Sequence, residues 1–363
     1  MRLPGIATLI LTLTFCPAAF GAAPDIGIVA RIHFNTQVRD FTKSRAFYRM
    51  LGFTAGRGGF PKTNTHEMAR SLGMYDLCTY EFFDAEVVSI PDSWGPATID
   101  IIQFVIPYND APPYALPNHL GMAYAALQTT DLASDVAFLK SQNVKFLAQR
   151  FGTPGNQFVF FKDPDGVLYK LSETSAPPPP TAAPLPSAPP GDAEADLHIT
   201  AMPYIAFNVR DFERSYAFYR RLGYTETTPL PEGGTLEEAR AYGLDRPFKI
   251  RGAQMALPHG DKHAIRIVQW LDPYDDEPPY APPINHIGID RLALYVLDLD
   301  AAVKTLKAEG VEFLSDIAPC CSGTGLDETG IINIVDPDGI FVELVGPIAV
   351  RGPQPPPQWC AAT

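Results

Sequence analysis

A sixteen-residue segment that occurs twice constrains the fold of this chain more than any other feature. Residues 38–53 are VRDFTKSRAFYRMLGF and residues 209–224 are VRDFERSYAFYRRLGY, with 11 of 16 positions identical. Each copy holds an Asp that can cap a helix N-terminus, and a Gly near its end that can adopt the left-handed conformation of a helix terminus. The repeat indicates a tandem duplication, and each copy predicts a helix that packs on a sheet.

The formal net charge of −13 narrows the classes of partner. Nucleic acids and anionic membranes are bound through clusters of Lys and Arg, so we expect neither as a partner. The 363 residues are enough for two cores of domain size. We therefore expect small molecules or proteins as partners, with a small-molecule ligand as the leading expectation, and the sequence leaves the oligomeric state open.

The first 23 residues predict a cleaved secretory signal. Arg2 precedes an apolar run at residues 6–15 that is too short to span a bilayer, and small residues follow it. A lipid anchor at Cys16 is the alternative, which the bulky Phe15 disfavours. No other apolar run is long enough to cross a membrane, so we expect a periplasmic or secreted protein.

An exported chain can form disulfides. The pairing of its cysteines is not determined by the sequence, although adjacent cysteines do not pair with each other without strain. After removal of the signal segment the cysteines are Cys78, Cys320, Cys321 and Cys360.

Proline-rich segments divide the mature chain. Residues 177–190 hold eight prolines interleaved with Ala and Ser, a composition that favours extended polyproline II structure and forms no packed core. We predict a linker at residues 174–196 between a first domain at 26–173 and a second at 197–348. The tail at 349–363 is also proline-rich, and we predict that it is disordered.

A fainter repeat divides each domain into two modules. Residues 131–139 (DLASDVAFL) resemble residues 40–48 (DFTKSRAFY), and residues 298–306 (DLDAAVKTL) take the same place in the second domain. Each domain ends in a predicted hairpin whose turn is DPDG, at 163–166 and 336–339. The predicted fold class is α+β, with four modules that each contain a strand, a helix and further strands.

The segments between modules, residues 107–121 and 273–288, are alike in both halves. Both retain an Asn-His pair, Asn118-His119 and Asn285-His286. A shared crossover explains this retention as well as a binding loop does, and we favour the structural interpretation. The alternative is a protein-interaction scaffold that binds partners through these acidic loops rich in Pro and Tyr.

The motif D-x-x-x-S-x-x-F-Y-x-x-L-G after the first strand, with D-P-D-G before the last, resembles the vicinal oxygen chelate superfamily. That group includes glyoxalase I, extradiol dioxygenases and bleomycin-binding proteins. The resemblance covers nearly the whole mature chain outside the linker and the tail. It implies that the two modules of each domain face one another and form a cup, with metal ligands at four strand positions.

The resemblance places the first ligand position at His33, seven residues before Asp40. Strand alternation supports this assignment, because residues 31, 33, 35 and 37 are all polar and share one face. The resemblance implies a first cup of His33, Asp100, Tyr124 and Lys170, and a second cup of Tyr204, Arg266, Arg291 and Glu343.

Neither predicted cup keeps the ligand set of the metal-dependent members. Divalent metals require neutral imidazole or anionic oxygen donors, and a cationic side chain at a ligand position repels the ion. We therefore predict no cofactor, with a divalent metal as the alternative. We expect salt bridges in the place of the metal, Lys170 with Asp100 and Arg266 with Glu343.

The residues at these positions suggest two kinds of chemistry. Guanidinium groups beside aromatic rings suit an anionic or aromatic ligand, whereas His33, Asp100 and Tyr124 are candidates for metal-free proton transfer. The leading hypothesis is an exported, metal-free small-molecule-binding protein. The alternative is a glyoxalase-like lyase or isomerase, or a dioxygenase-like enzyme with a degenerate metal site. The predicted ligand-binding residues are Lys170, Tyr204, Arg266, Trp270, Arg291, Tyr295, Phe341 and Glu343.

Overall fold

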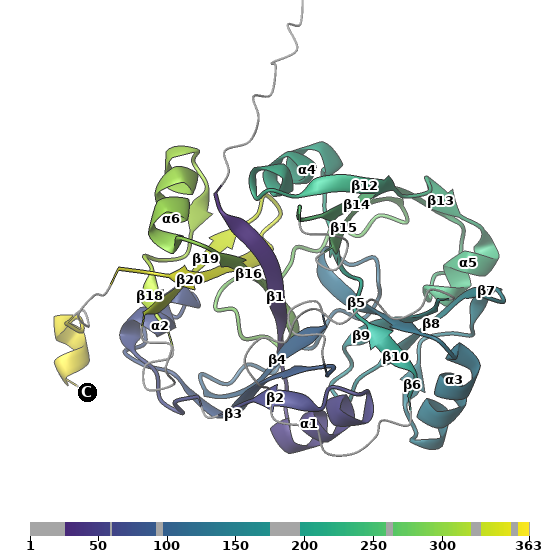
Figure 1. The fold of residues 1–363 in the computed structure, drawn as a ribbon, viewed down its shortest axis with the longest axis horizontal. Coiled ribbons are helices and arrows are strands. Elements are labelled where there is room, and N and C mark those ends of the chain that lie inside the picture. Colours follow the sequence, from purple (N-terminus) through teal and green to yellow (C-terminus); the bar gives the residue numbers. More distant parts are fainter. Residues whose placement is uncertain are drawn as a thin grey trace, which may run out of the picture.

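The computed structural model describes residues 26–58, 60–91, 97–174, 197–258, 264–320, 328–349 and 355–362. The predicted signal segment, most of the predicted linker and Cys321 lie outside these residues. The described chain forms two curved mixed sheets side by side, with helices on their outer faces (Figure 1). Among the described residues, no helix is long and apolar enough to cross a membrane.

The first two modules have the element order that the repeats predict. Module 1 contains β1 (Ile28–Gln37), α1 (Phe41–Met50), β2 (Ala55–Arg57), α2 (His66–Ser71), β3 (Glu81–Ser89) and β4 (Thr98–Ile106). Module 2 contains β5 (Gly121–Thr129), α3 (Leu132–Ser141), β6 (Lys145–Phe146), β7 (Phe151–Thr153), β8 (Asn156–Lys162) and β9 (Leu168–Glu173).

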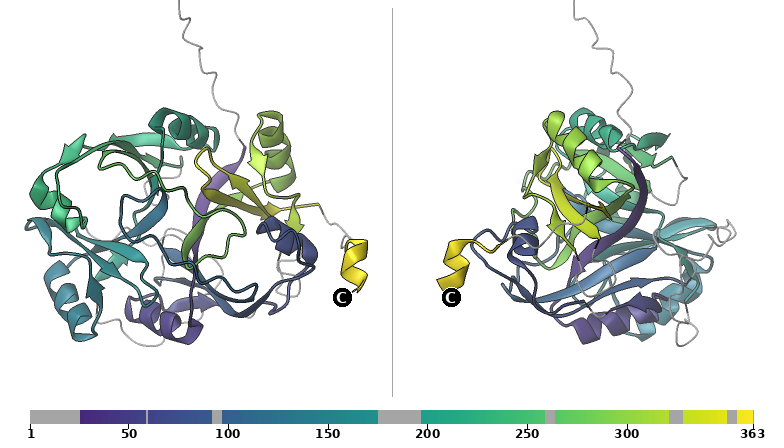
Figure 2. Two further views of the ribbon diagram at one scale, coloured as in Figure 1. Left: turned by 180° about the vertical axis from the view of Figure 1, so that it is seen from behind. Right: turned by 60° about the vertical axis from the view of Figure 1, so that its left-hand side comes forward.

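The second half repeats this order. Module 3 contains β10 (Ile199–Ala201), β11 (Tyr204–Asn208), α4 (Phe212–Arg221), β12 (Thr225–Pro229), β13 (Gly233–Gly234), α5 (Leu236–Ala241), β14 (Phe248–Ala256) and β15 (Ala264–Asp272). Module 4 contains β16 (Gly288–Val296), α6 (Leu299–Ala308), β17 (Glu312–Phe313), β18 (Ala318–Pro319), β19 (Thr329–Val335) and β20 (Phe341–Pro347). The short 3-10 helix η2 (Gln358–Ala362) lies apart from both sheets (Figure 2).

The main helix of each module begins at the Asp that the repeats share. In α1 the side chain of Asp40 accepts a hydrogen bond from the backbone N–H of Lys43 at 3.0 Å, and Asp211 does the same at α4. Asp131 and Asp298 cap α3 and α6 in the same way. The sequence prediction of helices at these places is confirmed.

The modules pair differently from the prediction. Sheet A has the order β17-β19-β20-β16-β1-β4-β3-β2 and joins module 1 to module 4. Sheet B has the order β12-β14-β15-β11-β5-β9-β8-β6 and joins module 3 to module 2. Figure 1 shows β1, from the start of the described chain, beside β16 and close to β20 from its end. The prediction that the two modules of each domain share a cup is wrong.

The ends of the proline-rich segment show why it does not separate the two sheets. The backbone N–H of Thr174 donates to Thr129 O at 2.9 Å, and that of Thr130 donates to His198 O at 3.2 Å. Both ends therefore lie at the same end of β5. The segment connects two modules of one sheet, and the sheets are connected by residues 107–121 and 273–288.

These two crossovers contact each other. The N–H of Ile287 donates to Ala111 O at 3.0 Å, and the rings of Tyr114 and Tyr280 stack with centroids 5.5 Å apart. The side chain of Asn285 donates to Pro107 O at 2.9 Å. These contacts favour the structural interpretation of the Asn-His pair that both crossovers contain.

The repeated motifs themselves hold sheet A to sheet B. The hydroxyl of Tyr48 in α1 donates to Asp163 of the first DPDG turn at 2.8 Å, and Ser44 donates to Asp165 at 2.9 Å. The second half repeats both bonds, through Tyr219 to Asp336 and Ser215 to Asp338. The Ser and Tyr of the helix motif and the two Asp residues of the turn are therefore parts of one contact between modules.

The hydrophobic core has three parts. The largest cluster lies between the helices and the sheets and between the two sheets, and includes Phe34, Leu292, Phe207 and Ile205. A second, smaller cluster lies on the concave face of sheet B, and a third lies on the concave face of sheet A. A disulfide joins Cys78 in module 1 to Cys360 in the tail, with Cα atoms 5.5 Å apart, and Cys320 is also disulfide-bonded.

Candidate functional site

The pairing of modules regroups the eight residues of the two predicted cups. We call the concave face of sheet A cup A and that of sheet B cup B. The register brings Asp100 and Arg291 to either side of Asn35 in sheet A, and Arg266 and Tyr124 to either side of Ala206 in sheet B. Cup A thus holds His33, Asp100, Arg291 and Glu343, and cup B holds Tyr124, Lys170, Tyr204 and Arg266.

Two predicted salt bridges are therefore wrong. Lys170 and Asp100 lie in different sheets, and so do Arg266 and Glu343. The predicted proton-transfer set is also divided, because Tyr124 is in cup B while His33 and Asp100 are in cup A. Each residue occupies the strand position that the sequence predicts, and only its opposite module differs.

A buried ion-pair network occupies one side of cup A. The guanidinium of Arg291 donates through Nε to Glu343 Oε2 at 2.7 Å and through Nη1 to Asp290 Oδ2 at 3.2 Å. Asp290 reaches the same guanidinium because a β-bulge lies opposite Asn35 and Thr36. Burial alone lowers the pKa of Arg291, but the carboxylates of Glu343 and Asp290 outweigh it and raise that pKa. Arg291 therefore carries a permanent charge inside the protein.

His33 and Asp100 lie on the other side of cup A. Asn35 Nδ2 donates to Asp100 Oδ2 at 2.7 Å, while Asp100 Oδ1 and His33 Nε2 have no hydrogen-bond partner among the described residues. Burial raises the pKa of Asp100 to about 7 and lowers that of His33 to about 4. The imidazole is therefore neutral near pH 7, and it is too weak a base to accept a proton there.

Arg31 does not share this face. Its guanidinium is fully buried and donates to Met202 O at 2.8 Å and to Ala264 O at 3.1 Å in module 3. A register shift between Arg31 and His33 changes the side on which residue 31 emerges. The predicted polar face of β1 therefore begins at His33.

Cup A does not fit the metal that the family resemblance implies. Three of its four positions are ligand types, but the fourth is Arg291, whose charge is already bonded to Glu343. Within the described part of the chain, no group of three or more His, Cys, Asp or Glu side chains is placed to hold a metal ion. A guanidinium at the centre of the set repels a divalent cation.

Helix α2 closes cup A from the side opposite the sheet. The carbonyl of Ser71 accepts from Asn333 Nδ2 at 2.9 Å, and that of Leu72 accepts from Ile284 N at 3.0 Å. Apolar side chains fill the space beneath, including those of Leu72, Tyr80, Phe104, Ile284 and Phe341.

Cup B has a different electrostatic character. The ammonium of Lys170, only 7% exposed, donates to Tyr242 Oη at 2.9 Å and lies 3.8 Å from the ring centroid of Phe158. Arg266 donates through Nη1 to Tyr204 Oη at 2.8 Å and through Nε to Gln254 Oε1 at 3.1 Å. No described carboxylate lies within ion-pair distance of either cation, and their side-chain hydrogen-bond partners are hydroxyl and amide groups.

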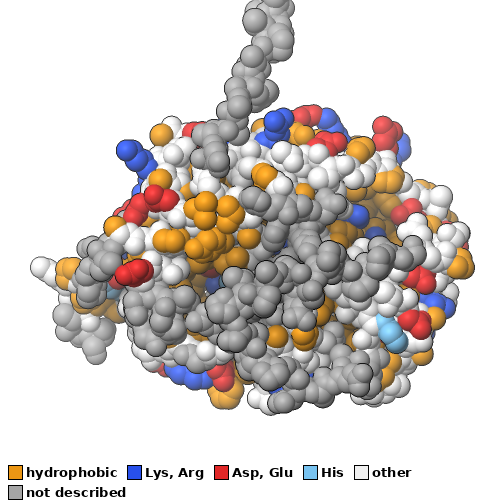
Figure 3. All heavy atoms as spheres, in the orientation of Figure 1, with side chains coloured by type: hydrophobic (Ala, Val, Ile, Leu, Met, Phe, Trp, Pro, Cys, Tyr) orange, Lys and Arg blue, Asp and Glu red, His pale blue; other side chains and the backbone are white. Residues whose placement is uncertain are grey.

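Aromatic side chains form the walls of cup B. Trp270 packs against Tyr242 and Phe248 and donates through Nε1 to Asn208 Oδ1 at 3.0 Å. Figure 3 shows a hollow over the sheet B side of the molecule, with Lys or Arg atoms at its floor and hydrophobic side chains around it. The predicted ligand residues Trp270, Lys170, Tyr204 and Arg266 are together in cup B. Phe341, by contrast, lies in cup A, and Tyr295 lies half-buried on β16.

The sequence prediction missed Tyr242 and Gln254 in cup B and Asp290 in cup A. Tyr242 had a signal in the repeat, because residues 66–73 (HEMARSLG) and 236–243 (LEEARAYG) share four positions. Tyr242 thus corresponds to Leu72, which closes cup A. The sequence held no such signal for Asp290, because only the β-bulge turns Asp290 toward Arg291.

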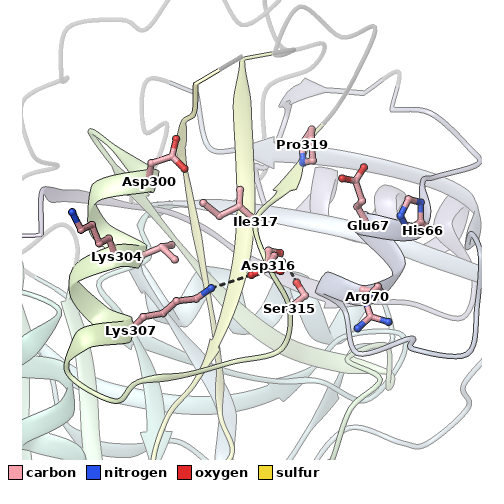
Figure 4. A pocket seen from close by; sticks show the side chains of 11 residues that line it. His66, Glu67, Arg70, Asp300, Lys304, Lys307, Ser315, Asp316, Ile317 and Pro319 are labelled. Atoms are coloured by element: carbon pink, nitrogen blue, oxygen red, sulfur yellow. Dashed lines mark hydrogen bonds and ion pairs between the residues drawn. The ribbon is translucent and has the colours of Figure 1, made fainter. Parts of the chain in front are cut away.

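A charged groove lies outside both cups. It has a volume of about 670 Å³ and separates α2 from α6. Figure 4 shows His66, Glu67 and Arg70 on one side and Lys304 and Lys307 on the other. Lys307 is ion-paired to Asp316 at 3.0 Å, and charges of both signs alternate around the rim. The groove follows from the pairing of modules 1 and 4 and offers no concentrated charge.

Comparisons with known proteins agree with the fold. A family model described as Glyoxalase/Bleomycin resistance protein/Dioxygenase superfamily matches residues 31–171 and 201–344. Glyoxalase I from Zea mays superposes with a TM-score of 0.54 and 16% identity, covering 87% of this chain and 92% of that one. A putative dioxygenase from Bacillus subtilis gives 0.53 and 11%, with coverages of 89% and 86%. Identities this low establish the fold alone. No curated protein matches the chain.

Proposed function

From the premise that the chain belongs to the Glyoxalase/Bleomycin resistance protein/Dioxygenase superfamily, as its motifs predict, we propose an exported, metal-free small-molecule-binding protein. Cup B is the binding site. Its ligand is a small anion, a carboxylate or a phosphate, with an aromatic or apolar body.

The observation that carries this proposal is the pair of cations in cup B. Burying an ammonium or a guanidinium is costly unless its charge is compensated. Lys170 and Arg266 are compensated only by hydroxyl, amide and ring contacts. Lys170 acts to lower the pKa of Glu238 of α5, although burial dominates and raises that pKa. A ligand anion supplies the missing charge.

The remaining donors suit such an anion. Lys170 has three N–H donors, one of which is bonded to Tyr242, and Arg266 has a planar fork that matches a carboxylate or a phosphate. Phe158, Trp270 and Tyr242 offer apolar surface to the rest of the ligand.

Export is supported by the disulfide between Cys78 and Cys360 and by the disulfide-bonded state of Cys320. Such bonds persist in oxidising compartments such as the periplasm and the extracellular space.

Calorimetry with 4-phenylbutanoate and its neutral amide, 4-phenylbutanamide, tests the binding site. We expect the carboxylate to bind more tightly. Lys170→Met and Arg266→Met should each weaken it by about 10–100-fold, because each removes a charge-assisted hydrogen bond. Lys145→Met, at an exposed position on β6, is the matched control and should bind like the wild type. Equal affinity for acid and amide contradicts the proposal, and so does a stoichiometric metal in the purified protein.

A further inference from the structure

The hydroxyl of Tyr204 lies at the centre of the polar groups in cup B. It accepts a hydrogen bond from Arg266 Nη1 at 2.8 Å and is hydrogen-bonded to the hydroxyl of Tyr124. The ring is only 4% exposed and lies under the guanidinium, whose central carbon is 3.7 Å from the ring centroid. Tyr204 on β11 corresponds to His33 on β1 at the repeat offset. Cup B therefore places a phenol oxygen among donors and cations where cup A has an imidazole.

These neighbours favour the ionised form of the phenol. Burial by itself raises the pKa of Tyr204, but Lys170 and Arg266 outweigh burial, so the pKa is lowered. Burial raises the pKa of Tyr124. The same direction holds for the described buried tyrosines of the core, Tyr48, Tyr169, Tyr219 and Tyr224. Among described tyrosines with a resolved shift, only Tyr204 moves downward.

We propose that Tyr204 is a general base, and that cup B catalyses proton exchange next to the ketone of an aromatic oxo-carboxylate. The inference rests on the proposed anion site. When Tyr204 is ionised, the cup retains one net positive charge from Lys170 and Arg266, which matches a monoanionic substrate.

The step is balanced without a cofactor. The phenolate oxygen of Tyr204 takes a proton from the carbon next to the substrate ketone. The electron pair of the broken C–H bond forms the carbon–carbon double bond of an enolate, and the ketone oxygen becomes negative. Lys170 and the Nη2 group of Arg266 stabilise that oxygen and the carboxylate. The proton now on Tyr204 exchanges with solvent, and the phenol then returns a solvent-derived proton to the same carbon, which completes the exchange and regenerates the phenolate.

Tyrosine ionisation tests the base directly and without ligand. In protein labelled with ¹³C at tyrosine Cζ, one resonance of the wild type should titrate below pH 10. That resonance should be missing in Tyr204→Phe and should titrate at higher pH in Lys170→Met, since this variant removes a cation beside the phenol. The inference is overturned if no wild-type tyrosine titrates below pH 10, or if the early resonance persists in Tyr204→Phe.

Deuterium exchange tests the catalysis. The probe is 3-benzoylpropanoate in D₂O, with loss of the proton signal next to its ketone followed by NMR. We expect the wild type to accelerate exchange, and Tyr204→Phe to lose at least about 100-fold of that rate while its far-UV circular dichroism is unchanged. An unchanged rate in Tyr204→Phe overturns the base role, and so does binding of the probe by the wild type without exchange. Failure of the wild type to bind either carboxylate refutes the anion site itself, while the ionisation result is independent of it.

Discussion

The disulfide between Cys78 and Cys360 gives a prediction whose size follows from the fold. Cys78 lies in module 1, between α2 and β3, whereas Cys360 lies in η2 beyond the last strand. The sequence separation of 282 residues makes this one of the longest loops the chain can close. Cys360→Ser removes the bond, and η2 lies apart from both sheets (Figure 2).

The expected loss is smaller than the loop length alone suggests. In the chain-entropy description, a bond that closes 282 residues in the unfolded chain contributes about 5.6 kcal/mol at 25 °C. The bond also restricts the folded chain. There it closes the segment from Ala349, the last described residue for which a hydrogen bond to module 4 is seen, to Cys360, a span of 11 residues (360 minus 349). Closing that shorter loop costs about 2.8 kcal/mol by the same relation. The net stabilisation is about 3 kcal/mol.

Urea unfolding followed by far-UV circular dichroism measures this difference. Cys360→Ser and Cys78→Ser should each lower the free energy of unfolding by about 3 kcal/mol, and the double variant should lose no more than either. A Cys78→Ser chain truncated before residue 355 is the matched control, and it should equal Cys360→Ser if the tail contributes only through the bond. A loss of less than about 1 kcal/mol would refute the loop-entropy reasoning. A loss above about 5 kcal/mol would show that contacts of the tail matter.

Three further predictions concern the linker and cup A, and denaturant unfolding tests each. Replacing residues 176–195 by Gly-Ser-Gly-Ser should stabilise the chain by about 1 kcal/mol, because the ends of the linker already meet at β5; destabilisation would contradict the sheet B pairing. Arg291→Met should cost about 3–5 kcal/mol, because Glu343 is left buried without its counter-ion, and adding Glu343→Gln should recover part of the loss. If Arg291→Met alone lowers the free energy of unfolding no more than the double variant does, the Arg291–Glu343 ion pair is contradicted. The folded pKa of Asp100, about 7, lies above its ordinary 3.8, so this group lowers wild-type stability as pH rises from about 4 to 7. Asp100→Asn should therefore gain about 3 kcal/mol on the wild type between pH 5 and pH 8; a gain independent of pH would contradict the buried carboxylate.

The electrostatic character of the cups was only partly predictable. The cationic residues at ligand positions were visible in the sequence. Their partners were not, because a partner depends on which module lies opposite. Arg291 was predicted beside Tyr204 and Arg266, yet it lies with His33 and Asp100 and bonds to Glu343 and Asp290. The neutral compensation of Lys170 by Tyr242 was equally invisible, because 72 residues separate the two.

The sequence by itself determined the modules of this protein. Capping Asp residues, glycines at helix ends, DPDG turns and strand alternation act over a few residues, so their effects are readable from local pattern. Tertiary structure alone decided that module 1 joins module 4 and module 2 joins module 3. The strands that compete for the edge of β1 are β5 and β16, which descend from the same repeat and carry nearly the same apolar pattern. Local pattern cannot rank such strands, and the choice depends on long-range packing between the crossovers, the helices and the turns.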